Sequence, residues 1–247
     1  MRKRRKDETM EQFLNKILFT DCINVLKGLP DKSIELVLTD PPYGRDIIKS
    51  GKIGDNGLTT VKDYGSEIWD SKSPEKIYFD EIFRVSKNQI IFGANYFIEK
   101  INKNSPCWIV WDKDNTGDFA DAELAWTSFN TPVKIYRWRW NGMIQQDMKN
   151  KENRIHPTQK PVKLFESILT DYYNFKSNGI VADFYSGSGT TAIACHNLGI
   201  PFICTEKKER YFNDSIKRFD EIKRQTKLFK PVIKTEYSQI KIDFVRE

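Results

Sequence analysis

Hydrophobic positions along this chain form two kinds of pattern. Short, nearly continuous apolar runs are typical of strands buried on both faces, and Ile34–Thr39 (Ile-Glu-Leu-Val-Leu-Thr) is the clearest of them. Apolar residues spaced three and four positions apart, as in residues 74–85, predict amphipathic helices. Because the two patterns alternate, the sequence predicts an α/β fold with a mostly parallel central sheet and helices on both faces.

The predicted elements follow one another closely. Strands are expected at 17–20, 34–39, 89–92, 107–111, 180–185 and 202–205, with an exposed or hairpin strand over 132–140. Helices are expected at 22–27, 74–85, 95–101, 192–198 and 210–225, with another running from the turn at 156–160 to about 173. Residues 44–73 carry weak periodicity and many polar residues, so they predict a long loop or lid.

Length and charge narrow the class of protein. The 247 residues suit one α/β domain with an insertion that reads a substrate. A net charge of +6 favours a polyanionic partner. Residues 1–6 (Met-Arg-Lys-Arg-Arg-Lys) have no apolar segment behind them, so no secretory signal is expected, and the basic tail is either solvated or in contact with phosphates. No apolar stretch approaches the ~20 residues of a membrane span.

Cysteine usage argues against a zinc site. Cys22, Cys107, Cys195 and Cys204 form no Cys-x-x-Cys pair, and the chain has two histidines. Each cysteine lies among apolar residues, as buried thiols do in a reducing cytoplasm. None has the surroundings of a nucleophile, and we expect no metal.

A glycine-rich turn follows the expected strand at 180–185. Gly187 and Gly189 allow the backbone to pass close to a ligand. Glu206 ends the next strand, where a carboxylate can accept hydrogen bonds from both ribose hydroxyls of an adenosine ligand. The turn is not Gly-x-Gly-x-x-Gly and lacks the lysine of a P-loop, so a nucleoside cofactor fits better than NAD or ATP. The alternative is a tight turn with a surface glutamate.

The strand at Ile34–Thr39 ends on Asp-Pro-Pro-Tyr, and this turn suits chemistry at a base amine. Such an amine is a poor nucleophile until both of its hydrogens are held, and Asp40 and the Pro41 carbonyl can each accept one. Pro41 and Pro42 preset these acceptors, which is electrostatic preorganisation. Tyr43 offers a flat face for a base removed from the duplex. The alternative is a proline-rich turn at a strand end.

Together these motifs resemble the DNA N6-adenine/N4-cytosine methyltransferase family, in its β-type branch, where the catalytic turn precedes the cofactor turn. The resemblance spans residues 17 to about 224, and His-Pro-Thr-Gln-Lys-Pro at 156–161 is highly specific to the family. It implies a Rossmann-like S-adenosylmethionine-dependent methyltransferase fold in circularly permuted motif order. Residues 1–247 are then one catalytic domain, with 44–73 and 117–154 as candidate lid or DNA-reading insertions.

The resemblance also implies roles for individual residues. Asp40, Pro41, Pro42 and Tyr43 hold the target base and carry catalysis. The cofactor is S-adenosylmethionine, and its expected contacts are Asp21, Cys22, Asp40, His156, Pro157, Thr158, Gln159, Lys160, Asp183, Phe184, Tyr185, Ser186, Gly187, Ser188, Gly189, Thr190, Thr191, Glu206 and Lys207. One departure is Asp183-Phe-Tyr185 where the family usually has Asp-Pro-Phe, which keeps an aromatic residue but alters the turn.

The segment 133–141 is the candidate DNA contact. Strand periodicity places Lys134, Tyr136, Trp138 and Trp140 on one face and Val133, Ile135, Arg137 and Arg139 on the other. Arg137 and Arg139 could contact phosphates or guanines, and Trp138 and Trp140 could stack on bases. The alternative is a core-packing hairpin with surface arginines. After the neighbouring strand, Asp112-Lys-Asp114 either lines the base pocket or forms a solvated turn.

We therefore expect methyl transfer from S-adenosylmethionine to adenine N6 of a flipped base in DNA, by direct in-line attack. Aspartate rather than serine at position 40 favours adenine by resemblance, and cytosine N4 is the alternative. A non-catalytic DNA-binding relative and an RNA or protein methyltransferase are the rivals from other classes. Expected partners are DNA, a second copy of the chain and a restriction endonuclease, in a prokaryotic or phage-encoded cytoplasmic protein.

Overall fold

A computed structural model describes residues 10–44, 52–53, 62–63, 72–115, 120–141 and 144–228. Of the predicted lid at 44–73, the described part includes the two short antiparallel strands β3 (Lys52–Ile53) and β4 (Lys62–Asp63). The basic tail at 1–6, most of the lid and parts of the 117–154 insertion lie outside the described residues.

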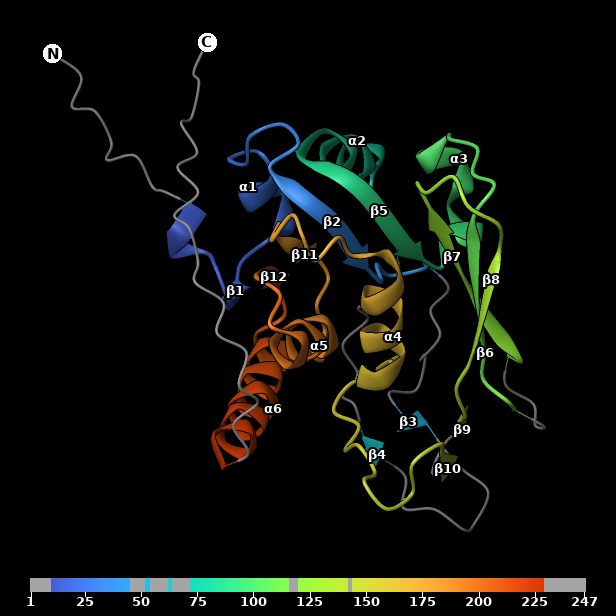
Figure 1. Cartoon of the computed structure of the whole chain (residues 1–247), viewed down its shortest axis with the longest axis vertical. Helices are drawn as coiled ribbons and strands as arrows, with labels where there is room; N and C mark the ends of the chain where they lie inside the picture. Colours follow the sequence, from blue (N-terminus) through green and yellow to red (C-terminus); the bar gives the residue numbers. More distant parts are fainter. Residues whose placement is uncertain are drawn as a thin grey trace, which may run out of the picture.

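The core of the fold is one twisted sheet, in which eight of the described strands take part (Figure 1). Its order is β1-β12-β11-β2-β5-β7-β6-β8. The bounds are β1 Lys16–Phe19, β2 Ile34–Thr39, β5 Ser86–Phe92, β6 Trp108–Asp112, β7 Ala122–Thr127, β8 Lys134–Arg137, β11 Val181–Asp183 and β12 Phe202–Glu206. Only β7 runs antiparallel to its neighbours among these eight strands, so the sheet is mostly parallel, as the sequence predicts.

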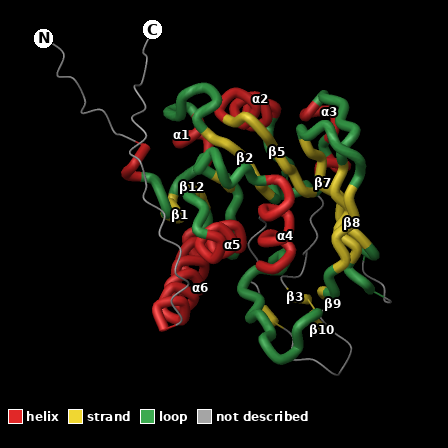
Figure 2. Tube along the Cα trace, in the orientation of Figure 1, coloured by secondary structure: helices red, strands yellow, loops and turns green. Residues whose placement is uncertain are grey.

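Helices cover both faces of this sheet (Figure 2). The helices α1 (Cys22–Leu26), α2 (Lys76–Val85) and α3 (Ile98–Ile101) pack on one face, and α4 (Val162–Tyr172), α5 (Thr190–Leu198) and α6 (Glu209–Leu228) pack on the other. Strand β2 shows why its apolar run is continuous: Ile34 and Val37 pack under the first set of helices, whereas Leu36 and Leu38 pack under the second.

Two short 3-10 helices (Met10–Gln12 and Ala94–Tyr96) and the two-stranded pair β9 (Trp140–Asn141) and β10 (Ile144–Gln145) complete the described elements. None of the described helices is long and apolar enough to cross a membrane. The four cysteines are all buried, as their apolar surroundings predict.

The sequence prediction differs from the structure in three places. It missed β7, whose Ala-Glu-Leu-Ala-Trp-Thr run has a glutamate where a buried strand would carry an apolar residue. The helix expected at 95–101 is divided at Phe97 into a 3-10 helix and α3. The strand expected at 132–140 ends at Arg137, and Trp140 begins the separate strand β9.

Candidate active site

The turns predicted to carry chemistry meet at one edge of the sheet. Strand β11 lies between β2 and β12 and pairs with both in parallel, so the turns after all three strands emerge side by side. They surround a cavity of about 480 Å³. Most predicted site residues line it: Asp21, Cys22, Asp40, Pro42, His156, Thr158, Gln159, Lys160, Asp183, Phe184, Tyr185, Ser186, Gly187, Ser188, Thr190, Thr191, Glu206 and Lys207. Pro41, Tyr43, Pro157 and Gly189 were predicted with them but do not line this cavity.

Asp183 joins the two central strands to helix α5. Its buried carboxyl accepts hydrogen bonds from Thr39 Oγ1 at 2.9 Å, Thr191 Oγ1 at 2.5 Å and the Tyr185 backbone N–H at 3.1 Å. Burial raises the pKa of Asp183 to about 6, although these hydrogen bonds oppose the rise. Two hydroxyl donors and one backbone donor thus hold this carboxyl in place.

The glycine turn brings Glu206 to the cavity wall. Gly187 and Gly189 have φ values of +47° and +75°, a backbone conformation that glycine adopts most readily. Glu206 accepts the Gly187 N–H at 3.0 Å and the Lys208 N–H at 2.8 Å, and the side chain is buried. Burial raises the pKa of Glu206, whereas the two N–H donors favour its ionised form.

The side-chain oxygen of Ser186, Oγ, is buried at the cavity wall. It makes no hydrogen bond within the described part of the chain. A buried hydroxyl without a partner is destabilising, so a ligand with a polar group beside Ser186 would satisfy it.

Asp21 and Cys22 begin α1 on the far side of the cavity. Asp21 caps the helix by accepting the Ile23 N–H at 3.0 Å, and Lys207 Nζ lies 3.9 Å from its other oxygen. Burial and the adjacent Asp21 charge raise the pKa of the Cys22 thiol to about 12. The Cys22 thiol is therefore protonated at neutral pH.

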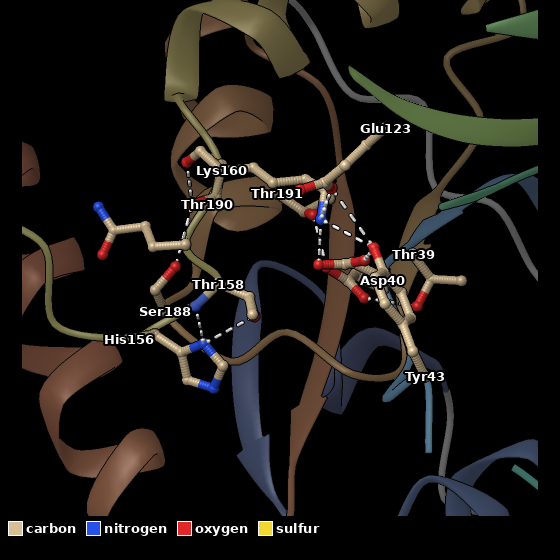
Figure 3. Close-up of polar contacts among 12 residues, drawn as sticks. Thr39, Asp40, Tyr43, Glu123, His156, Thr158, Lys160, Ser188, Thr190 and Thr191 are labelled. Carbon is tan, nitrogen blue, oxygen red and sulfur yellow. Dashed lines mark hydrogen bonds and ion pairs between the residues drawn. The ribbon is translucent and has the colours of Figure 1, made fainter. Parts of the chain in front are cut away.

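The loop at 156–161 is held in shape by its own side chains. His156 Nδ1 lies 3.3 Å from the Thr158 backbone nitrogen, and burial lowers the pKa of this histidine to about 3, so it is neutral. Gln159 Oε1 accepts the Ile155 N–H at 2.9 Å, which uses its side chain within the loop. Thr190 Oγ1 donates to the Lys160 carbonyl at 3.1 Å and thereby ties the loop to the start of α5 (Figure 3).

Asp40 lies in a buried cluster of charges at the end of β2 (Figure 3). Lys160 Nζ forms an ion pair with Asp40 Oδ2 and lies 3.0 Å from Glu123 Oε2. Tyr43 donates its hydroxyl to Asp40 Oδ1 at 2.7 Å. On the other side of Glu123, Lys113 Nζ lies 2.5 Å from Oε1. Lys160 was predicted as a cofactor contact, and in the structure its ammonium group pairs with Asp40 and Glu123.

The ring of Tyr43 has its own supports. It stacks on Tyr96 with ring centroids 4.9 Å apart. It also lies against Gly93, where a Cβ atom would come within 1.9 Å of Tyr43 Cε1. Gly93 therefore leaves the space that the Tyr43 ring occupies.

The predicted DNA-contact strand takes the core-packing alternative on its aromatic face. Trp140 is 7% exposed and donates its indole N–H to the Gln159 carbonyl at 2.9 Å, and Trp138 packs against the core. This corrects the prediction that Trp140 stacks on bases. Arg137 and Arg139 lie on the surface, where they form exposed ion pairs with Asp112 and Asp114. Asp112 and Asp114 do not line the cavity.

Sequence reasoning missed several residues at this site. Glu123 comes from the unpredicted strand β7. Three further residues line the cavity: Phe165 from α4, Lys208 just before α6 and Tyr211 from the first turn of α6. Arg218 donates to the Ser188 carbonyl at 2.9 Å and pairs with Glu152 at 2.6 Å. These two contacts hold the glycine turn in place. A buried arginine or glutamate inside an amphipathic element gives no local sequence signal that its partner lies far away.

Comparison with known proteins gives consistent matches. A family model described as DNA methylase matches residues 94–217, half of the chain. Type II methyltransferase M.HinfI of Haemophilus influenzae is 29% identical, over 87% of this chain and 71% of its own length. Putative methylase YubD of Escherichia coli (strain K12) is 22% identical, over 85% and 92% respectively.

Solved structures share the fold. The M1.HpyAVI–SAM complex superposes with a TM-score of 0.51 at 23% identity, covering 82% of this chain and 98% of that one. PvuII DNA methyltransferase (cytosine-N4-specific) has a TM-score of 0.52 at 15% identity, covering 85% and 91%. The fold class, with its mostly parallel sheet, is thus the one expected from the sequence. With the family model spanning half of its residues, the chain belongs to the DNA methylase family of N6/N4 amino-methyltransferases.

Proposed function

We propose that this chain transfers a methyl group from S-adenosylmethionine to N6 of adenine in DNA, with the cofactor in the 480 Å³ cavity and the base at Asp40–Tyr43. The observation that carries the proposal is the position of Asp40. Asp40 directly follows β2 and lines the same cavity as the glycine turn and Glu206. A methyl donor in the cavity and an amine held by Asp40 would therefore be neighbours.

The residues of the cavity fit S-adenosylmethionine. The Glu206 carboxylate, held by two backbone N–H groups, can accept hydrogen bonds from ribose hydroxyls. The unsatisfied Ser186 hydroxyl can serve a polar group of the ligand. The bound cofactor supplies an electrophilic methyl group.

The Asp-Pro-Pro-Tyr turn can prepare the amine. Each carboxylate oxygen has two lone pairs, so Asp40 can accept an amine hydrogen while it keeps its bonds to Lys160 and Tyr43. The Pro41 carbonyl can accept the second hydrogen, and the two proline rings fix the backbone that presents it. Holding both hydrogens localises the nitrogen lone pair toward the methyl donor.

Adenine is preferred to cytosine because position 40 is aspartate, which the resemblance associates with N6 methylation. The fold is shared with a cytosine-N4-specific enzyme, so fold likeness does not choose between the two bases. Cytosine N4 methylation is accordingly the alternative outcome of the experiment below.

We also propose that DNA is contacted by the segments 44–73 and 117–154 of a single catalytic domain. Arg137 and Arg139 are the described candidates, since their side chains are 73% and 48% exposed. A second copy of the chain and a restriction endonuclease remain predicted partners.

The test uses the purified full chain, tritiated-methyl S-adenosylmethionine and plasmid DNA from a host without DNA methylation. Enzymatic digestion to nucleosides and mass spectrometry should identify N6-methyladenine. Asp40→Ala should abolish transfer but leave cofactor binding largely intact in calorimetric titration, whereas the control Asp80→Ala, on the surface of α2, should be fully active. N4-methylcytosine as the product, or an active Asp40→Ala variant, would contradict the proposal.

A further inference from the structure

The ammonium group of Lys160 is enclosed by the protein. The side chain is 3% exposed, and its Nζ is the cation between two carboxylates, Asp40 from the end of β2 and Glu123 from β7. The ring of Phe92 lies beneath it, with the centroid 4.9 Å from Nζ. Burying an ammonium group at this depth is costly unless it is paired, and here it is paired twice.

The three N–H donors of Lys160 have three oxygen partners within the protein. They are Asp40 Oδ2, Glu123 Oε2 at 3.0 Å and the Tyr43 hydroxyl at 3.4 Å. An ammonium group has three donors and no acceptor, so this set leaves none for a carboxylate of the cofactor. Lys160 therefore lines the cavity with the other residues of its motif, but its ammonium group is directed to Asp40, Glu123 and Tyr43.

Rigid elements on all sides hold the cluster in place. Glu123 lies within the ladder between β6 and β7, opposite Trp111, and its second oxygen binds Lys113. The backbone of Lys160 is tied to α5 through Thr190. The ammonium groups of Lys160 and Lys113 and the carboxylates of Asp40 and Glu123 sum to zero net charge. All four groups can therefore be ionised together inside the protein.

We propose that Lys160 and Glu123 are positioning residues for methyl transfer: Lys160 keeps the Asp40 carboxylate ionised and oriented toward the target amine, and Glu123 holds the Lys160 ammonium group in place. Lys160 supplies the charge that favours the carboxylate form, and Glu123 fixes where that charge sits. The proposal rests on the proposed role of Asp40, because neither residue contacts the amine itself.

An ionised Asp40 is needed because a protonated carboxyl would lose acceptor strength toward the amine hydrogens. Burial raises the pKa of Asp40, and the Lys160 ammonium opposes that rise. Burial likewise opposes ionisation of Glu123, but Lys160 and Lys113 outweigh it and lower the pKa of Glu123 to about 2. Other titratable groups that face the cluster are Tyr43 and Tyr96 beside Asp40, Asp183 from β11, and His156 on the Lys160 loop.

The two residues act on the Asp40 pKa with opposite signs, which gives the test its direction. Removing the Lys160 charge raises the pKa, so the acid limb of the methyl-transfer rate moves to higher pH. Removing the Glu123 charge lowers the pKa, so the limb moves to lower pH. A neighbouring charge at this distance typically displaces a carboxyl pKa by about 1–3 units.

The experiment measures single-turnover methyl transfer to unmethylated plasmid DNA from pH 5 to 9, at saturating tritiated-methyl S-adenosylmethionine. Lys160→Met should lose most activity at low pH and recover as pH rises, with its acid limb about 1–3 pH units above that of the unmodified chain. Lys160→Arg should restore the original limb, and Glu123→Gln should move it downward. The matched control is Lys163→Met, three residues further on and 64% exposed, which should leave the profile unchanged.

Cofactor affinity, measured by calorimetry, separates this role from the others. A Lys160→Met loss that is constant across the pH range, or that matches a proportional loss of cofactor binding, would overturn the proposal and return Lys160 to the cofactor contacts. A Glu123→Gln limb that moves upward would overturn it as well. If Lys160→Met does not fold, Glu123→Gln and Lys160→Arg still test the direction. Failure of the proposed function is distinguishable, because only that failure leaves Asp40→Ala active.

Discussion

Replacing Asp183 with asparagine tests what it costs the fold to bury a carboxyl group between β2 and β11. The amide has nearly the same shape, and it preserves the hydrogen bonds. Its oxygen can accept from Thr39 and the Tyr185 N–H, and its NH₂ group can donate to the Thr191 hydroxyl, which then acts as the acceptor. The change therefore removes a titrating group without opening a cavity.

The magnitude follows from the pKa of Asp183, which burial raises from the ordinary value of 3.8 to about 6. A displacement of this size corresponds to about 3 kcal/mol of unfolding free energy. Because the folded state holds the proton more tightly, the full stabilisation is present below pH 3.8 and is lost as pH rises through about 6. At neutral pH the folded protein carries the whole cost of the buried charge.

Urea denaturation of both proteins between pH 4 and 8, followed by tryptophan fluorescence, gives the difference in unfolding free energy at each pH. We expect Asp183→Asn to gain about 3 kcal/mol relative to the unmodified chain between pH 4 and 7.5. The control Asp80→Asn, at a side chain that is 54% exposed, should show no such gain. A difference that stays constant with pH would mean that Asp183 titrates normally and that the argument from burial fails.

Three further substitutions test the cofactor wall and the aromatic support. Glu206→Gln should weaken S-adenosylmethionine binding tenfold or more in calorimetric titration, because charge-assisted hydrogen bonds contribute about 1.5–3 kcal/mol. An unchanged Kd would place the ribose acceptor elsewhere. Tyr43→Ala should slow labelled-methyl transfer to a paired duplex more than transfer to a duplex that is mismatched at the target. Stacking contributes about 1–3 kcal/mol, and a mismatched base is extruded more easily. Equal losses of rate on the two duplexes would make Tyr43 a packing residue. Gly93→Ala should lower both the melting temperature and the methylation rate, because its Cβ would lie 1.9 Å from Tyr43 Cε1. Gly199 has a similar φ of +68° and open space around it, so Gly199→Ala is the control for backbone strain alone. If Gly93→Ala and Gly199→Ala had equal effects, the Tyr43 ring would be able to move aside freely.

The parts of the fold that the sequence predicted well are those with a local physical cause. Strand β2 is found at the predicted residues because its apolar run is buried on both faces and two prolines must end it. The helix expected at 192–198 ends at Leu198 as predicted, because Gly199 follows it with a φ of +68°. The turns after β2 and β11 lie side by side because parallel strands bring their carboxyl ends to one edge of the sheet.

The parts that were missed depend on partners distant in sequence. Glu123 made β7 look unlike a buried strand, and its burial is explained only by Lys160 and Lys113, which approach from other elements. The sequence predicted that Trp140 stacks on bases, but in the structure its indole N–H donates to the Gln159 carbonyl in the loop at 156–161. In both cases a local pattern could not include the group that satisfies the polar atom.

Asp40 follows β2 and Asp183 ends the neighbouring strand β11, and both line one cavity, but different groups surround their carboxyl groups. Asp183 receives hydroxyl and backbone donors, so burial raises its pKa to about 6, and it stands close to its titration point. Asp40 receives an ammonium group held by a second carboxylate, and that ion pair favours the charged form. When environments separate two carboxyl groups in this way, they can take different parts in one reaction. Asp40, the group proposed to accept amine hydrogens, is the one supplied with a cation, whereas Asp183, which joins β2, β11 and α5, is held by neutral donors. The sheet allows this division because it brings the ends of β2 and β11 together, although Thr39 and Asp183 are 144 positions apart in the sequence.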